Sequence, residues 1–226
     1  MKKSILFLML FAMFVQVQSQ TIEPKDPSKK KPSSDLENLR LANQLAHYGY
    51  KTFSATALIE AARIMGTIKT QDLKVDSFKQ EGTSKDEYAK KSTEKYDMTS
   101  ILAAAKKYAD GDTKLLADIA GLEKANEAKR GRVGGPGEKY STVWGNGVDT
   151  YQLSFIANEL AEIVVVGDGD TDLDLYVFDS NMNIIARDID YTDGCVVGWV
   201  PKWTGRYYVK IVNRGPISNL YHLITN

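Results

Sequence analysis

The chain has 226 residues, with 29 lysines and arginines against 29 aspartates and glutamates, so it is formally neutral. A chain without excess positive charge offers no general attraction to nucleic acid or to an anionic membrane. Its single cysteine, Cys195, excludes an intrachain disulfide, so an exported form would depend on core packing, on a metal or on both. Cys195 stands in an apolar run and is expected to be a small buried hydrophobe, not a nucleophile.

Residues 1–19 have the pattern of a secretory signal peptide. Two lysines follow the first methionine, residues 5–15 are apolar, and residues 17–19 fit a cleavage site. The apolar run is shorter than the roughly 20 residues that span a bilayer. We therefore expect an exported protein, periplasmic or secreted, with no transmembrane segment in the mature chain. The alternative is an uncleaved signal anchor.

Residues 20–33 are rich in lysine, proline and serine and are expected to form a disordered linker. A helical domain is predicted for residues 34–130. Ser34 and Glu37 have the spacing of a capping box, and the first helix is expected to stop near Gly49. A second helix is predicted from about Ser54 to Gly66, packed against the first as a hairpin.

Residues 80–95 are polar and lack apolar periodicity, so they are predicted to be a loop or a weak exposed helix. Helical spacing resumes after Asp97, a plausible N-cap, and continues beyond a turn at residues 110–112. Two helical hairpins would pack as a small all-α bundle. Residues 131–139 are rich in glycine and are predicted to link this bundle to a second domain.

Residues 140–226 read as short strands separated by turns. The eight predicted strands cover residues 140–144, 150–155, 161–166, 173–178, 184–187, 195–200, 206–213 and 220–224. So many short strands favour a β-sandwich. The predicted fold class is therefore α+β as two domains, an all-α bundle followed by an all-β sandwich.

An acidic stretch precedes and enters the fourth predicted strand, with four aspartates at alternate positions: Asp168, Asp170, Asp172 and Asp174. Their mutual repulsion requires solvation, a cation or raised pKa values. Calcium takes six to eight oxygen ligands, so the stretch predicts a Ca2+ site, completed by Asp149 or by a residue of the loop at 188–193. An EF-hand is excluded because Leu173 stands where that loop needs glycine. The alternative is a solvated acidic turn whose carboxylates cap backbone N–H groups.

Aromatic residues are frequent in the predicted sandwich, and most are expected to be core or inter-strand pairs. Tyr207 and Tyr208 are neighbours on one strand and must face opposite sides. Trp203, beside a turn, is expected to be partly exposed. We therefore name Trp203 and Tyr208 as candidate ligand-binding residues.

Catalytic patterns are absent from the sequence. The only histidines, His47 and His222, fall in different predicted domains, and no nucleophile elbow, phosphate loop, HExxH or CxxC motif occurs. We therefore predict a protein that is not an enzyme, with no catalytic residues. The alternative is a secreted hydrolase, or a hydrolase subunit, with a site in the cleft between the domains.

Three blocks of the C-terminal half, residues 148–155, 170–179 and 203–211, resemble a known family in order and spacing. That family is the bacterial pre-peptidase C-terminal domain, related to the collagen-binding domains of clostridial collagenases. The resemblance implies a jelly-roll-like sandwich that serves as a secreted accessory module beside hydrolases, with calcium bound in some members. Here about a hundred helical residues stand where a peptidase would precede the module. The resulting prediction is an exported binding or accessory protein that attaches to protein or polysaccharide.

Overall fold

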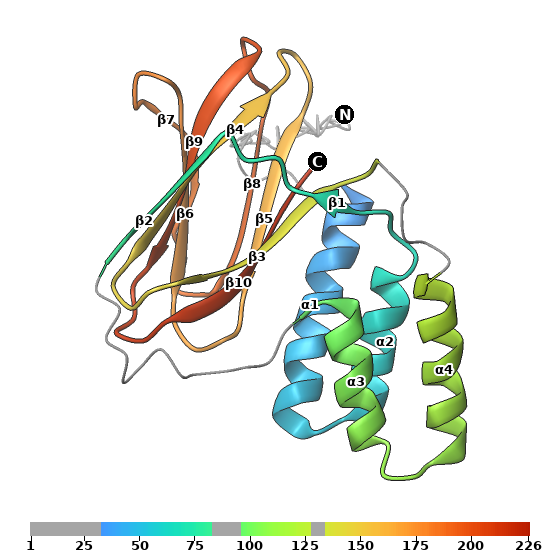
Figure 1. Cartoon of the computed structure of the whole chain (residues 1–226). Coiled ribbons are helices and arrows are strands. Elements are labelled where there is room, and N and C mark those ends of the chain that lie inside the picture. Colours follow the sequence, from blue (N-terminus) through green and yellow to red (C-terminus); the bar gives the residue numbers. More distant parts are fainter. Residues whose placement is uncertain (1–32, 83–95, 128–133) are drawn as a thin grey trace, which may run out of the picture.

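The computed structural model describes residues 33–82, 96–127 and 134–226 (Figure 1). The predicted signal peptide, residues 20–32 of the first predicted linker, residues 83–95 of the predicted loop and residues 131–133 of the second predicted linker lie outside these ranges. The helices are α1 (Ser34–Thr52), α2 (Ala55–Met65), α3 (Met98–Tyr108) and α4 (Thr113–Glu127). None of these helices, in the part of the chain that is described, is long and apolar enough to cross a membrane.

Ten strands follow or interrupt the helices: β1 (Gln71–Asp72), β2 (Ser77–Glu81), β3 (Gly137–Val143), β4 (Val148–Phe155), β5 (Ala161–Gly167), β6 (Leu173–Phe178), β7 (Ile184–Asp188), β8 (Gly194–Trp199), β9 (Gly205–Asn213) and β10 (Asn219–Thr225). They form two five-stranded sheets. Sheet A has the order β1-β3-β10-β5-β8 and sheet B the order β2-β4-β9-β6-β7. All pairings are antiparallel except that of β1 with β3. The chain is thus α+β, and all eight strands predicted from the sequence are present.

The sandwich core lies between the two sheets. Alternate residues of β9 point into it, so Tyr207, Val209 and Ile211 are buried while their neighbours are partly exposed or exposed. This alternation is typical of a strand with one buried face. Leu175 and Val177 enter the same core from β6.

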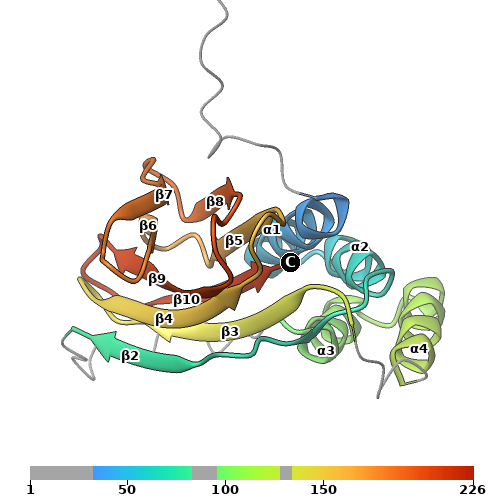
Figure 2. The same ribbon diagram turned by 90° about the horizontal axis from the view of Figure 1, so that it is seen from above.

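The outer face of sheet A is also buried, because the helices pack on it (Figures 1 and 2). Val164, Val166 and Ile224 turn away from the sandwich core and join the helical core around Leu36 and Leu58. Every residue of β5 is consequently buried. The helices and sheet A share one continuous apolar core, since the same contact cluster contains residues of both.

The sequence signals place the starts of α2 and α3 correctly and the start of α1 one residue too late. Ser54 and Asp97 cap α2 and α3, accepting the N–H groups of Ala57 and Ser100. The capping box at Ser34 is wrong by one residue: Ser33 occupies the N-cap and makes no side-chain cap bond.

The predicted stop of the first helix at Gly49 is wrong, because α1 continues to Thr52. Gly49 serves helix packing instead. A Cβ atom there would lie 2.6 Å from Leu58 Cδ2, so only glycine lets α2 approach this closely. Phe53, with φ of 56°, adopts the left-handed conformation that ends the helix.

The prediction of an all-helical segment over residues 34–130 is wrong at β1 and β2, which add an edge strand to each sheet. β2 is exposed along most of its length, so no apolar alternation marks it. Tertiary partners create it: Gln80 Nε2 donates to Asp149 Oδ1 at 2.8 Å, and the Phe78 ring lies 4.8 Å from that of Tyr151. Likewise, β3 begins at Gly137, inside the predicted glycine-rich linker 131–139.

Candidate functional site

The four aspartates of the acidic stretch occupy different environments. Asp168 is buried and its carboxylate accepts the backbone N–H groups of Leu220 at 3.0 Å and Asp170 at 3.2 Å. Burial raises the pKa of Asp168 despite these bonds. This carboxylate therefore accepts backbone N–H groups at the turn between β5 and β6, as in the alternative interpretation of the sequence, but it is buried and not solvated.

Asp170, Asp172 and Asp193 line a shallow hollow at this turn. Burial is the main cause of the raised pKa values of Asp172 and Asp193, and neighbouring carboxylates add to it. Within the described residues, Asp172 Oδ1 is buried without a hydrogen-bond partner, while Asp193 accepts the N–H of Gly169. Negative charge in this hollow thus carries an uncompensated desolvation cost.

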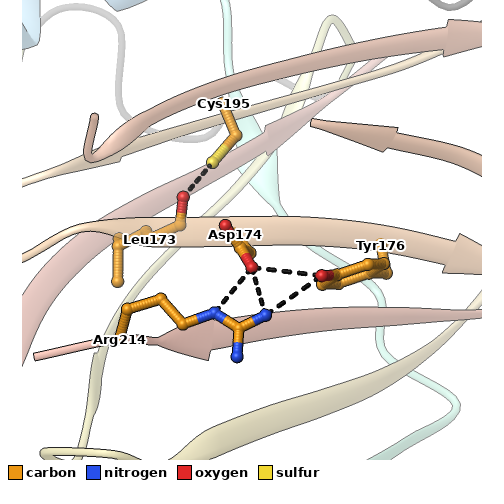
Figure 3. A network of polar contacts seen from close by, with 5 residues as sticks. All are labelled: Leu173, Asp174, Tyr176, Cys195 and Arg214. Atoms are coloured by element: carbon orange, nitrogen blue, oxygen red, sulfur yellow. Dashed lines mark hydrogen bonds and ion pairs between the residues drawn. The ribbon is translucent and has the colours of Figure 1, made fainter. Parts of the chain in front are cut away.

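Asp174 belongs to the outer face of sheet B (Figure 3). Arg214 Nε donates to Asp174 Oδ2 at 2.7 Å, and a second guanidinium nitrogen contacts the same oxygen. The Tyr176 hydroxyl donates to this oxygen at 3.1 Å. Behind the strand, Cys195 is buried, as the sequence predicted, and its thiol donates to the carbonyl oxygen of Leu173 at 3.0 Å.

The remaining acidic residues considered for the site have local partners. Asp149 is fully buried, and Tyr221 donates to its Oδ2 at 2.6 Å. Asp188 and Asp190 accept the backbone N–H groups of Val196 and Thr192. Across the described ranges, no group of three or more His, Cys, Asp or Glu side chains has an arrangement that could hold a metal ion. The four named aspartates therefore do not fit a single calcium cage.

The outer face of sheet B carries side chains in rows across the strands. Residues directly opposite one another form an aromatic row of Ile184, Phe178, Tyr208, Gln152 and Ser77. The next row, which we call the basic row, contains Arg187, Tyr176, Lys210, Thr150 and Lys79. We call both rows together the row face. All ten residues are partly or largely exposed.

Contacts within the row face hold its rings in place. The rings of Tyr176 and Phe178 stack with centroids 6.1 Å apart and planes inclined by 21°, and Lys210 Nζ lies 5.2 Å from the Phe178 centroid. Arg214 also donates to the Tyr176 hydroxyl, at 3.1 Å. Fixed rings lose little conformational entropy when a ligand covers them.

The charge of the row face is positive. Lys79 pairs with Glu81, and Asp174 with Arg214. Within the described residues, Arg187 and Lys210 have no ion-pair partner.

The two candidate ligand-binding aromatics lie at different places. Tyr208 belongs to the aromatic row. Trp203 stacks on Tyr207, with centroids 5.7 Å apart and planes inclined by 15°, and is 39% exposed in the turn before β9. Sequence reasoning missed Tyr176 and Phe178. Their alternation with the buried Leu175 and Val177 would have placed them beside Tyr208 only with the strand order known.

His222 anchors the helices to sheet A. It is 1% exposed and stacks on Tyr140 with centroids 3.9 Å apart. Asn43 Nδ2 lies 2.8 Å from His222 Nδ1, and His222 Nε2 lies 3.1 Å from Glu138 Oε2. Because Asn43 presents an N–H group to Nδ1, the proton sits on Nε2 and is donated to Glu138. Burial lowers the pKa of His222, so the imidazole is neutral.

A pocket of about 200 Å³ opens beside this network, where the helices meet β3. We call it the junction pocket. It is lined by Leu39, Met65, Gly66, Ile68, Lys69, Thr70, Asp97, Met98, Asn126, Glu138 and Tyr140. None of these described lining residues is a serine or cysteine.

No protein-family model matches the sequence, and no curated protein sequence matches it. Among solved structures, the chain is similar to the pre-peptidase C-terminal domain of collagenase from Bacillus anthracis, with 14% identity over 39% of this chain and 87% of that chain and a TM-score of 0.33. Aeromonas hydrophila PliG, a periplasmic lysozyme inhibitor of g-type lysozyme, has 15% identity over 40% and 84% of the two chains and a TM-score of 0.30.

The Yersinia pseudotuberculosis-derived mitogen has 16% identity over 42% of this chain and 86% of that chain, with a TM-score of 0.30. The Bacillus anthracis structure is a pre-peptidase C-terminal domain, the family that the residue pattern resembles.

Proposed function

We propose that this is an exported, non-enzymatic binding or accessory protein that attaches to protein or polysaccharide through the row face. The observation that carries the proposal is the open outer face of sheet B. Phe178 and Tyr208 lie directly opposite each other on it. In the next row, Tyr176 lies between Arg187 and Lys210, two cations without ion-pair partners among the described residues. Tyrosine and arginine are enriched at binding hot spots because they combine apolar area with hydrogen bonding. Export rests on the pattern of residues 1–19.

The chemistry of the junction pocket supports the non-enzymatic reading. A general acid requires a carboxyl group with a raised pKa. The pKa of Glu138 is instead lowered: burial acts to raise it, but the hydrogen bonds that its carboxylate accepts from His222 and Thr70 act in the opposite direction. The alternative is a hydrolase whose active site lies between the helices and the sheet, and the junction pocket is lined by residues of both. Any turnover abolished by Glu138→Gln would favour it.

Two finer features implied by the family resemblance belong to the same proposal: a jelly-roll-like connection and stabilisation by calcium. For calcium, the support is restricted to the unpartnered Oδ1 of Asp172, which would serve as one oxygen ligand of a cation bound in the hollow that Asp172 lines with Asp170 and Asp193.

The test measures retention of the purified protein on insoluble peptidoglycan, chitin and gelatin. We expect binding to at least one support. The double variant Phe178→Ser/Tyr208→Ser should bind at least about tenfold more weakly, because two ring contacts at about 1 kcal/mol or more are lost. Lys210→Glu should also weaken binding, and the loss should be larger at low salt than at high salt because salt screens the charge of this exposed side chain.

The matched control is Tyr48→Ser, which removes a ring that is 57% exposed on α1. Circular dichroism spectra and melting curves establish that each variant is folded. Equal retention of the double variant and the control would refute the row face as the attachment site.

A further inference from the structure

The junction pocket has one apolar wall and one polar wall. The apolar wall is built from Leu39, Met65, Ile68 and Met98, and comes from all three of the first helices and the segment after α2. Its volume of about 200 Å³ is well above the roughly 30 Å³ of one water molecule and below that of most drug-sized sites. The cavity therefore suits a small ligand with a short apolar body.

The polar wall presents a carboxylate that is held in position. Thr70 Oγ1 donates to Glu138 Oε1 at 2.7 Å, and His222 Nε2 donates to Oε2 at 3.1 Å. Asn43 fixes the tautomer of His222, and Asn43 is itself held by the Leu39 carbonyl at 2.8 Å. Each Glu138 oxygen retains acceptor capacity toward the pocket. This is a fixed anionic group supported by a buried second layer of hydrogen bonds.

Other charges at the pocket leave it negative. Asp97 lines the cavity while capping α3 through Ser100, and its charge acts on Glu138. Lys69 is the one cation among the described lining residues, and it is exposed. Two carboxylates against one exposed ammonium favour a cationic ligand. Because His222 is neutral, the network behind Glu138 adds no compensating positive charge.

We propose that the junction pocket binds a small amphiphilic amine, with its ammonium group on Glu138 and its apolar body against the wall of Leu39, Met65, Ile68 and Met98. This site is separate from the row face, so either assignment can fail without the other. Binding there would bridge α1, α2, α3 and β3 and stabilise the union of helices and sheet A.

Calorimetric titration of the purified protein with n-pentylamine, n-pentanol and pentanoate tests the proposal. These probes share one apolar chain and differ in head-group charge. We expect binding of n-pentylamine at millimolar or lower Kd, at least fivefold tighter than n-pentanol, and no binding of pentanoate. Glu138→Gln keeps a hydrogen-bond acceptor but removes the charge, and should weaken n-pentylamine at least fivefold.

Asp97→Asn provides a second variant that keeps the helix cap, and should weaken n-pentylamine about twofold or more; it decides the matter if Glu138→Gln fails to fold. Asp118→Asn, an exposed carboxylate on α4, is the matched control and should leave affinity unchanged. Equal affinity for n-pentylamine and n-pentanol, preference for pentanoate, no binding of any probe, or n-pentylamine binding that folded pocket variants leave unchanged would each overturn the proposal.

Discussion

The outer faces of the two sheets differ in exposure: the helices bury one of them and leave the other uncovered. On sheet A, Val164, Val166 and Ile224 are buried beneath the helices. On sheet B, the equivalent outward positions carry the row face, and no described helix covers them (Figure 2). One sheet thus contributes a wall of the core that it shares with the helices, while the outer face of the other sheet is not covered by any described helix.

The strands of the two sheets differ correspondingly in their patterns of apolar and polar residues. β5 contains the continuous apolar run 163–166, as expected of a strand buried on both faces, although Glu162 of the same strand is charged and buried. β9 instead alternates buried with partly exposed residues from Tyr207 to Asn213. The comparison also predicts how unequally the two faces should respond to the same substitution.

The largest effect is expected from truncating a valine on each face. Val164→Ala removes methyl groups from a fully buried position under α1 and should cost about 2 kcal/mol, the transfer term plus a cavity. Val212→Ala makes the same change on the partly exposed face of sheet B and should cost under about 1 kcal/mol. Urea unfolding measures both. Equal losses would contradict the assignment of the two faces.

The ion pair beside the row face should give the next effect. Arg214→Ala leaves the nearly buried Asp174 carboxylate with only the Tyr176 hydroxyl, and should cost about 1–2 kcal/mol, discounted because Arg214 is half exposed. Arg206→Ala is the control, since its contact with Asp76 at 3.7 Å joins two largely solvated groups. If Arg214→Ala lowers the free energy of unfolding no more than Arg206→Ala does, the ion pair of Arg214 with Asp174 does not stabilise the fold.

A smaller, pH-dependent effect should come from His222. Its folded pKa is lowered, mainly by burial, so the unfolded chain takes up the proton first as the pH falls. The stability contributed by the neutral imidazole is complete above about pH 6.5 and declines as the pH falls toward the folded pKa. Unfolding free energies between pH 7.5 and 5.5 measure this slope. His222→Gln should flatten it, and an unchanged slope in a folded variant would count against the lowered pKa of His222.

The smallest effect is expected at the acidic hollow. If calcium relieves the desolvated carboxylates there, 10 mM calcium chloride should raise the melting temperature by about 2–4 °C, the equivalent of about 1 kcal/mol. Asp172→Asn should abolish the rise, and Asp35→Asn on α1 should not. A melting temperature equal to that in sodium chloride of the same ionic strength would show that calcium does not bind at this hollow.

Sequence reasoning located the four helices and eight of the strands, because periodicity and turn residues report local geometry. It missed β2, whose exposed residues gain their strand form only by pairing with β4. It grouped Asp168 through Asp174 by their spacing, but strand direction sends Asp174 toward Arg214 and turn geometry sends Asp168 toward Leu220. Contacts between distant segments, such as Asn43 with His222, leave no local signature.

The central contrast between a covered and an open face can be measured by hydroxyl-radical footprinting with mass spectrometry. In the free protein, Tyr176 and Tyr208 should be oxidised readily, while Tyr50, which is 6% exposed in the core shared by the helices and sheet A, should resist. On the support that retains the protein, Tyr176 and Tyr208 should become protected and Tyr50 should not change. Rapid oxidation of Tyr50 in the free protein, or retention without protection of Tyr176 and Tyr208, would contradict the account.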